Sequence, residues 1–399
     1  MAPPKERHRM KTLAVHAGED PDPVTGAAVP NLVMSTSFVV DEPVAFSALD
    51  MGEDPPFFYT RWDNPTLRQL ATKLAALEGA EAAEVYASGM AATSAILFGV
   101  LGAGDHVVMS DTMYAGTAEL GRHTLSRFDI ESSFVDTSNL DQLADATRSQ
   151  TRLVWIETPA NPILRLTDIA GAAEIAHQAG AELVVDSTFA TPVATRPLEL
   201  GADYVLHSLT KYIGGHGDAL GGAVLGSKEA LSHLNVEATI HFGGSLSPFN
   251  AWLIMRGMAT LPLRMEAHQS NALEVARYLE TSPSVKAVTY PGLESHPQHD
   301  LAHRQMENFG GMLTFQVPDG ESMAERMRKE LEVFHFAVSL GHHRSLIYWM
   351  STSAMMATSF KLTGEQLASY RALAGDGVFR TSVGLEDPAD LIEDLERVL

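Results

Sequence analysis

The stretch Tyr204-Val-Leu-His-Ser-Leu-Thr-Lys211-Tyr-Ile-Gly-Gly-His216-Gly is an apolar run that ends in hydroxyl groups and one amine. Twenty-five positions before Lys211, Leu183-Val-Val-Asp186 ends a second apolar run with a carboxylate. Short apolar runs of this kind predict buried strands. A lysine at the end of a buried strand is costly as a charged group, and it is useful as a neutral nucleophile.

The same pattern recurs through the first two thirds of the chain and predicts an α/β fold. Short apolar strands alternate with amphipathic helices, which is typical of a mainly parallel sheet covered on both faces. We expect a large domain over 61–255. Its strands are predicted near 84–87, 106–110, 153–157, 183–186, 204–207 and 222–226, and its helices over 64–79 and 169–179.

The remaining residues predict two further parts. Residues 1–60 are rich in Pro, Gly and Asp and indicate an extended arm, which in an oligomer would contact a neighbouring subunit. Residues 256–399 predict a smaller α+β domain. A long helical stretch, 247–279, interrupted near Pro262, leads into it. Its strands are expected at 312–317, 336–340 and 379–383, and its helices at 323–331 and 387–399.

Composition excludes several classes of protein. The chain has 399 residues, 45% of them hydrophobic, a net charge of −22 and no cysteine. The negative charge argues against nucleic acid and anionic membranes as partners. Without cysteine there is no disulfide, thiol nucleophile or thiolate metal site, and no HExxH-like pattern indicates a metal. With no membrane-spanning run and no secretory signal, we expect a cytoplasmic protein.

The amine and the carboxylate together indicate a cofactor. Pyridoxal 5'-phosphate (PLP) needs a lysine as its Schiff-base partner and an anion for its pyridinium nitrogen, and Lys211 and Asp186 offer both. Ser88-Gly89-Met90 follows a strand and opens a helix, so it can present a hydroxyl and free N–H groups to a phosphate. Ser208 and Thr210 flank the lysine and can donate to the same phosphate.

Many ordered motifs resemble one family over nearly the whole chain, the Cys/Met-metabolism (trans-sulfuration) PLP-dependent enzymes, and within it most resemble the methionine and cystathionine γ-lyases. The resemblance implies the PLP-dependent transferase fold type I, as in aspartate aminotransferase. The matching stretches are Tyr59-Thr-Arg61-Trp-Asp-Asn64-Pro-Thr, Ala87-Ser-Gly-Met-Ala91, Glu157-Thr-Pro-Ala-Asn161-Pro, Val185-Asp-Ser-Thr-Phe, His207-Ser-Leu-Thr-Lys-Tyr212, Gly215-His-Gly-Asp218, Tyr290-Pro-Gly-Leu293 and Arg380-Thr-Ser-Val-Gly-Leu-Glu386.

The resemblance also implies roles for individual residues. Lys211 would carry PLP, Asp186 would pair with its ring nitrogen, and the Gly89 and Met90 amides would help to hold its phosphate. Tyr114 would stack on the ring and act as an acid or base. Arg380 would bind the substrate carboxylate, helped by Asn161 and Ser339. Tyr59 and Arg61 would reach the phosphate of a neighbouring subunit, so we expect a homo-oligomer, a tetramer built from active dimers. For His207 and His216 we expect structural hydrogen bonds.

The expected reaction is γ-elimination from a γ-substituted L-amino acid. The resemblance places Val338 where cystathionine γ-lyases carry a Glu that would meet a distal ammonium. This difference weakens the hypothesis that cystathionine is the substrate. Gly116 stands where methionine γ-lyases typically carry Cys, which widens the pocket. The leaving group could be a thiol, as with methionine or homocysteine, or a hydroxyguanidine, as with canavanine. The residues His342, His343 and Arg344 also depart from the family pattern, and their role stays open.

Two alternatives stay open beside the γ-lyase. One is γ-replacement, as in cystathionine γ-synthase or O-acylhomoserine sulfhydrylase. The other is a non-catalytic PLP-fold protein, which the intact set of Lys211, Asp186, Tyr114 and Arg380 disfavours.

Overall fold

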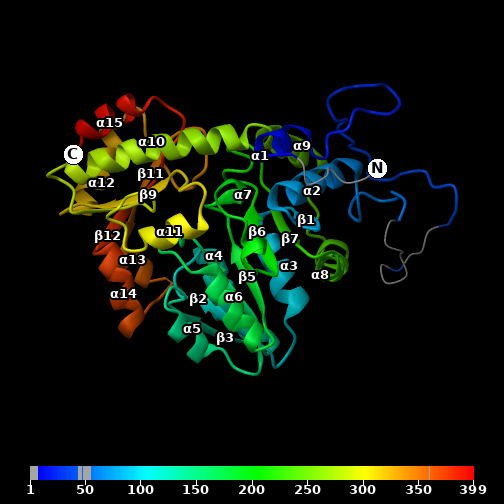
Figure 1. Cartoon of the computed structure of the whole chain (residues 1–399), viewed down its shortest axis with the longest axis horizontal. Helices are drawn as coiled ribbons and strands as arrows, with labels where there is room; N and C mark the ends of the chain where they lie inside the picture. The colour runs from blue at the N-terminus through cyan, green and yellow to red at the C-terminus, as the bar shows by residue number, and fades with distance from the viewer. Residues whose placement is uncertain (1–7, 44–46, 48–54, 359) are drawn as a thin grey trace. The chain divides into compact units, whose positions relative to one another are not determined.

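The computed structural model describes residues 8–43, 47, 55–358 and 360–399 (Figure 1). The chain divides into two compact units, each made of two segments: Met1–Leu101 with Asp203–Pro262, and Gly102–Ala202 with Leu263–Leu399. The expected boundaries at residues 60 and 255 stay a prediction. Part of the expected N-terminal arm, residues 1–7, 44–46 and 48–54, lies outside the described residues.

The first unit contains three neighbouring antiparallel strands. β1 (Ala82–Tyr86) pairs with β7 (Gly222–Gly226), which pairs with β6 (Tyr204–Ser208). Most residues of these strands are apolar and buried, as the sequence predicts, and the main exception is Glu84 in the middle of β1. The helices of this unit are α1 (Met10–His16), α2 (Pro65–Glu78), α3 (Gly89–Val100), α8 (Lys228–Leu234), a π-helix (Asn235–His241) and α9 (Pro248–Met258).

The helix expected over 64–79 is α2, and its ends follow from local chemistry. The Asn64 side chain accepts a hydrogen bond from the Thr66 N–H at 2.8 Å, and Pro65 occupies the first turn, where its missing N–H costs nothing. Gly79 ends the helix at φ +77°, a conformation that glycine adopts without strain.

The N-terminal arm is not extended throughout, because it contains the helix α1. This helix packs on α2. The Lys73 side chain of α2 is fully buried. Its ammonium donates to the Ala14 carbonyl at 2.8 Å and pairs with the Glu19 carboxylate. This buried charge has both a carbonyl and a carboxylate as partners, which is the condition for burying it at tolerable cost. The periodicity of the sequence carries no sign of this tether.

The second unit holds a parallel sheet in the order β5-β4-β2-β3. Its strands are β2 (His106–Ser110), β3 (Glu131–Val135), β4 (Thr151–Glu157) and β5 (Glu182–Asp186). Figure 1 shows α6 (Ile169–Gln178) lying along these strands, and its Ala172, Ala173 and Ala176 join Val154 and Val185 in one apolar core. The short helices α4 (Ala115–Glu119), α5 (Leu140–Ala146) and α7 (Thr191–Ala194) connect the strands.

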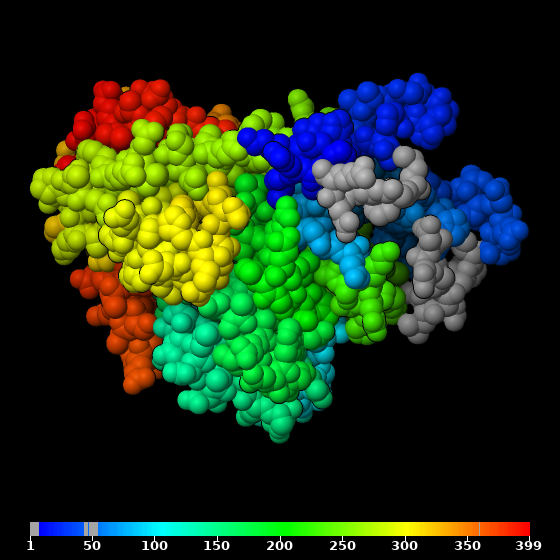
Figure 2. All heavy atoms as spheres, in the orientation of Figure 1, coloured from blue at the N-terminus to red at the C-terminus, as the bar shows by residue number. Residues whose placement is uncertain are grey.

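The same unit contains a second sheet of mostly antiparallel pairs, in the order β10-β11-β12-β9-β8. The strands are β8 (Ala287–Thr289), β9 (Met312–Gln316), β10 (His335–Phe336), β11 (Leu346–Ser351) and β12 (Gly377–Ser382). The helices are α10 (Leu261–Thr281), α11 (His299–Gln305), α12 (Gly320–Glu330), α13 (Thr352–Met356), α14 (Gly364–Ala374) and α15 (Pro388–Glu396). Figure 2 shows α15 (red) directly against α10 (yellow-green), where Ala276 and Leu279 share a core with Leu391 and Leu395.

Two details of the C-terminal part differ from the expectation. The strand predicted over 336–340 is only His335–Phe336, because the backbone turns to a positive φ at Ser339. The long helix breaks at residues 259–260, and Pro262 lies in the first turn of α10 rather than at the break itself. The other elements expected in this part, including the final helix, are present.

Candidate active site

The N-terminus of α3 meets the ends of two strands within the first unit. The Ser88 hydroxyl caps the helix by accepting from the Ala91 N–H at 3.1 Å. A Cβ on Gly89 would lie 3.0 Å from both Cβ and Oγ of Ser208, at the end of β6. A Cβ on Gly222, at the start of β7, would lie 2.2 Å from the Ser88 carbonyl oxygen. Only glycines permit this approach, which brings the helix N-terminus against the Ser208 hydroxyl and creates a cradle suited to an anion.

Lys211 lies in the turn that follows β6 rather than on the strand itself. Its N–H donates to the Ser208 carbonyl at 3.2 Å, and its carbonyl accepts from the Gly215 N–H at 2.8 Å. The Thr210 hydroxyl accepts from the Gly221 N–H at 3.2 Å. These contacts hold the lysine backbone next to Ser208, and hence next to the α3 N-terminus. The structure thus brings together Ser88, Gly89, Ser208, Thr210 and Lys211, and Met90 lies in the first turn of α3.

The two histidines near Lys211 make structural hydrogen bonds, as expected. His207 Nε2 lies 2.8 Å from the Glu78 carboxylate, with both side chains buried. His216 Nδ1 lies 2.8 Å from the Gly214 carbonyl oxygen. Both interactions fix the backbone on either side of Lys211.

Tyr59 and Arg61 lie together in the segment before α2. The Arg61 guanidinium carbon is 5.4 Å from the centre of the Tyr59 ring, within the range of a cation–π contact. The same guanidinium donates to the Ile240 carbonyl oxygen in the π-helix. Tyr59 is 42% exposed.

In the second unit, two carboxylates end neighbouring strands. Asp186 is the last residue of β5 and Glu157 the last of β4, and the two are paired in register. Asp186 Oδ1 accepts from the Thr188 N–H at 3.1 Å and from the Thr188 hydroxyl at 2.6 Å. Both acids are almost fully buried. Ligands of parallel sheets bind at the carboxyl ends of strands, which is where both lie.

Glu157 is the site residue to which the sequence assigned no role. One of its carboxyl oxygens accepts from the Tyr114 N–H at 2.7 Å, and the other from the Asn161 N–H at 2.8 Å. Burial raises the pKa of Glu157 well above its usual value, and the neighbouring charge of Asp186 raises it further. The two N–H bonds and the positive charge of Arg380 act in the opposite direction. The signal in the sequence was the same as for Asp186, an acid at the end of an apolar strand.

Arg380 on β12 is buried and engages two of the residues expected to assist it. Its Nη1 donates to Asn161 Oδ1 at 2.9 Å, and its Nη2 donates to the Ser339 carbonyl at 3.0 Å. Ser339 reaches this position with φ +93°, a strained conformation for a residue other than glycine. Such strain persists only where the surroundings impose it, and here the imposed result is a carbonyl oxygen aimed at the guanidinium. The Ser339 carbonyl is therefore one of the groups that orient Arg380.

The residues expected to bear on the leaving group lie at exposed or half-buried positions. Tyr114 precedes α4, with a side chain 48% exposed, and Gly116 lies in the first turn of that helix. Val338 is 63% exposed, next to Ser339. His342 and His343 are half-buried and Arg344 is exposed, and the His343 carbonyl accepts from the Leu385 N–H at 2.9 Å.

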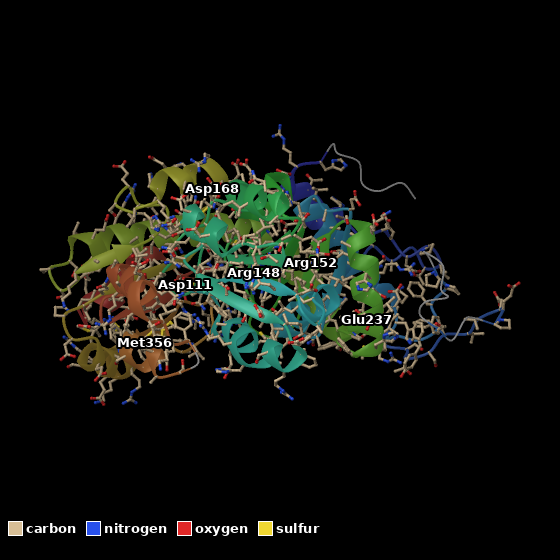
Figure 3. All side chains as sticks on the ribbon, turned by 90° about the horizontal axis from the view of Figure 1, so that it is seen from below. Asp111, Arg148, Arg152, Asp168, Glu237 and Met356 are labelled. Carbon is tan, nitrogen blue, oxygen red and sulfur yellow. The ribbon has the colours of Figure 1, made fainter. Side chains whose placement is uncertain are left out.

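A buried ion network supports the segment that carries Tyr114. Arg165 pairs with Asp111, labelled in Figure 3 just beyond the end of β2, and with Asp136 at 2.7 Å. Burial raises the pKa of Asp111, while the Arg165 charge opposes the rise. The Ser369 hydroxyl of α14 donates to Asp136 at 2.9 Å, so the network also joins α14 to the parallel sheet.

Within the described part of the chain, no group of three or more His, Asp or Glu side chains could hold a metal ion. No helix in the described ranges is long and apolar enough to cross a bilayer.

The chain is similar to known proteins over nearly its whole length. The family model described as Cys/Met metabolism PLP-dependent enzyme matches residues 11–399. A canavanine γ-lyase of Rhizobium leguminosarum bv. trifolii is 43% identical over 392 residues, 97% of this chain and 95% of the relative. A cystathionine γ-synthase of Mycobacterium bovis is 42% identical over 388 residues, 97% of this chain and 96% of the relative.

A solved structure shows the same fold over the entire chain. The crystal structure of metB from Corynebacterium glutamicum superposes with a TM-score of 0.89 and 36% identity, covering 100% of this chain and 99% of that one. The expected α/β architecture, with a mainly parallel sheet and a smaller C-terminal sheet, is confirmed, and so is the cofactor, PLP. The chain belongs to the family of Cys/Met metabolism PLP-dependent enzymes.

Proposed function

We propose that this chain catalyses γ-elimination from a γ-substituted L-amino acid. The observation that carries the proposal is the buried clamp of Arg380 and Asn161, hydrogen-bonded through Glu157 to the Tyr114 backbone. A clamp of this kind binds an amino-acid carboxylate in a bidentate way. It also ties the carboxylate site to the backbone of a half-exposed phenol, which can serve as acid or base. The canavanine γ-lyase and methionine γ-lyase among the relatives support elimination.

The residues present fit PLP. The cradle of Gly89, Ser208 and the α3 N-terminus, which a single Cβ at Gly89 would fill, suits a phosphate, and Met90 would add its amide. Lys211 would hold the aldehyde and Asp186 the ring nitrogen. When bound, PLP draws electrons from the substrate and so makes the protons on Cα and Cβ acidic.

The protein's own residues then carry the protons. Once the amino group of the substrate has replaced it at the aldehyde, the free amine of Lys211 would take the proton from Cα. It would then pass that proton to the cofactor and take a second one from Cβ. Tyr114 gives a proton to the leaving group at Cγ as that bond breaks. General acid–base steps of this kind contribute about 10²–10⁴-fold each. Arg380 and Asn161 hold the carboxylate, so that the chain of the substrate extends toward Gly116 and Val338.

The leaving group is the finer part of the proposal. Gly116 and the exposed Val338 offer no charge to a distal ammonium, which disfavours cystathionine. A thiol, as in methionine or homocysteine, or a hydroxyguanidine, as in canavanine, fits better. The second candidate, γ-replacement, is favoured by the cystathionine γ-synthase relative.

Tyr59 and Arg61 are proposed to act on the phosphate of a neighbouring subunit in a homotetramer of active dimers. A mixture of Arg61→Ala and Lys211→Ala subunits tests this, because hybrid dimers would contain one intact site. Recovered activity on mixing supports the sharing of sites, and its absence contradicts it. We also keep a cytoplasmic location as a proposal.

A substrate screen tests the reaction. Purified holoenzyme is incubated with canavanine, methionine, homocysteine, cystathionine and an O-acylhomoserine, with and without an added thiol. We expect release of the γ-substituent from one of the first three in the absence of the thiol. Turnover only of an acylated homoserine with an added nucleophile would establish γ-replacement instead, and no turnover of any γ-substituted amino acid would reject the proposal.

A further inference from the structure

One buried carboxylate holds two backbone segments that are distant in sequence. Glu157, at the end of β4, accepts from the Tyr114 N–H at 2.7 Å and from the Asn161 N–H at 2.8 Å. Each carboxyl oxygen takes one of these bonds. Tyr114 follows β2 and Asn161 follows β4, so the carboxylate fixes the relative position of the two segments.

The hydrogen bonds continue from Asn161 to the carboxylate clamp. Asn161 Oδ1 accepts from Arg380 at 2.9 Å, and Arg380 donates to the Ser339 carbonyl at 3.0 Å. Tyr114, Glu157, Asn161, Arg380 and Ser339 thus form one continuous chain within the second unit. The side chain of Tyr114 and the guanidinium of Arg380 are both expected to touch the substrate. Glu157 joins the backbone of Tyr114 to that of Asn161, which accepts from Arg380.

The chemistry of the link requires two acceptor oxygens. Two N–H donors converge on Glu157, so both of its oxygens must accept. A glutamine of the same shape has one oxygen and one NH₂ group, and the NH₂ group would face one of the two N–H donors. Burial and Asp186 raise the pKa of Glu157, while the two N–H bonds and Arg380 favour its charged form. A substitution by glutamine therefore disturbs these two bonds while it keeps the shape of the side chain.

We propose that Glu157 is a positioning residue, which sets the distance between the Tyr114 phenol and the Arg380–Asn161 carboxylate clamp by bonding the Tyr114 and Asn161 amides. The proposal rests on the proposed γ-elimination. Glu157 itself touches neither substrate nor cofactor in this account. It acts through the two segments that it joins, and small errors in such positions are known to cost large factors in rate.

The test compares Glu157→Gln with wild type and with Glu174→Gln as a matched control, since Glu174 is exposed on α6. In the holoenzyme, Glu157→Gln is expected to lower kcat/KM about 10- to 100-fold, the range produced by one unpaired amide at a buried site. We expect KM to rise and kcat to fall together, because the clamp and the phenol are both displaced. A structural cap alone would reduce the folded fraction and leave KM unchanged.

Hydrogen exchange of the cofactor-free protein gives a second readout that does not depend on activity. Mass spectrometry follows peptides that contain Tyr114 and Asn161. Glu157→Gln should speed exchange of at least one of these amides about tenfold or more, and Glu174→Gln should leave both unchanged. If Glu157→Gln does not fold, hydrogen exchange of the wild type decides. The Tyr114 and Asn161 amides must then be protected, and exchange of these amides at the rate of an exposed loop would overturn the proposal.

The two failures are distinguishable. If wild type turns over no γ-substituted amino acid, the proposed function falls, while the exchange experiment still decides whether Glu157 holds the two amides. If wild type is active and Glu157→Gln keeps the wild-type kcat, KM and exchange, the positioning role is wrong.

Discussion

Replacing Gly89 by alanine is predicted to weaken PLP binding without unfolding the protein. The new Cβ would lie 3.0 Å from Cβ and Oγ of Ser208 and 3.4 Å from its Cα. Comfortable carbon contacts are about 3.5–4.0 Å, so Ser208 must retreat by about half an ångström. Overpacking of this kind costs about 1–3 kcal/mol, and alanine in place of glycine within a helix returns up to about 1 kcal/mol.

The effect on the cofactor should exceed the effect on stability. Moving Ser208 and the α3 N-terminus apart weakens hydrogen bonds to a phosphate, and bonds to charged groups contribute about 1.5–3 kcal/mol each. The dissociation constant for PLP should therefore rise about 10- to 100-fold. Titration of the cofactor-free protein with PLP, followed by absorbance, measures it. Gly102→Ala is the matched control, because its Cβ would meet only the Asp105 carboxylate, at 3.6 Å.

An unchanged PLP dissociation constant in Gly89→Ala would contradict the prediction that Gly89 and Ser208 form the phosphate cradle. It would mean that the phosphate lies elsewhere than against Gly89 and Ser208. A loss of affinity in Gly102→Ala as large as that in Gly89→Ala would refute it as well, since the effect would then not come from the close approach.

Three further changes have expected outcomes. Burial raises the pKa of Glu84 to about 7, above its usual 4.5. The folded chain therefore holds this proton more tightly than the unfolded chain, and the free energy of unfolding falls by about 3 kcal/mol as pH rises from below 4.5 to above 7. Glu84→Gln should reduce this fall in the free energy of unfolding. Denaturant titrations at pH 5 and pH 8 measure the fall, and a fall as large in the variant as in wild type would contradict the prediction. Asp394 accepts from three N–H groups, at Glu332, Val333 and Phe334, each at 2.9 Å. Asp394→Ala should cost about 3 kcal/mol of stability by urea unfolding, and a loss below about 1 kcal/mol would contradict the buried role. Arg380→Lys keeps the charge but not the planar fork, so steady-state kinetics should give a KM about tenfold higher or more, and an unchanged KM would remove Arg380 from the clamp.

The sequence predicted the elements that carry the chemistry because their apolar runs are short, continuous and bounded by polar residues. β5 ends at Asp186 as expected, and β2 and β7 have the expected bounds. β3 was missed because Glu131-Ser-Ser-Phe-Val135 has no apolar run, and its burial is only partial. Pairing with β2 makes it a strand, which local pattern does not show.

The contacts that join distant segments were beyond the reach of the sequence. Glu157 bonds a residue 43 positions away, and Arg380 bonds one 219 positions away. Local pattern identifies such residues as polar strand ends but says nothing of their partners. The positive φ of Ser339 is imposed from outside in the same way, and the carbonyl of this residue accepts from Arg380. The individual site roles taken from the family resemblance stay predictions.

The most direct test of the account is the identity of the lysine that carries the cofactor. Holoenzyme is reduced with borohydride, digested and analysed by mass spectrometry. If Lys211 carries PLP, we expect one phosphopyridoxyl group per chain, on the peptide that contains Lys211, and none in a Lys211→Ala variant. A group on another lysine, or a wild-type chain that takes up no PLP after reconstitution, would contradict it.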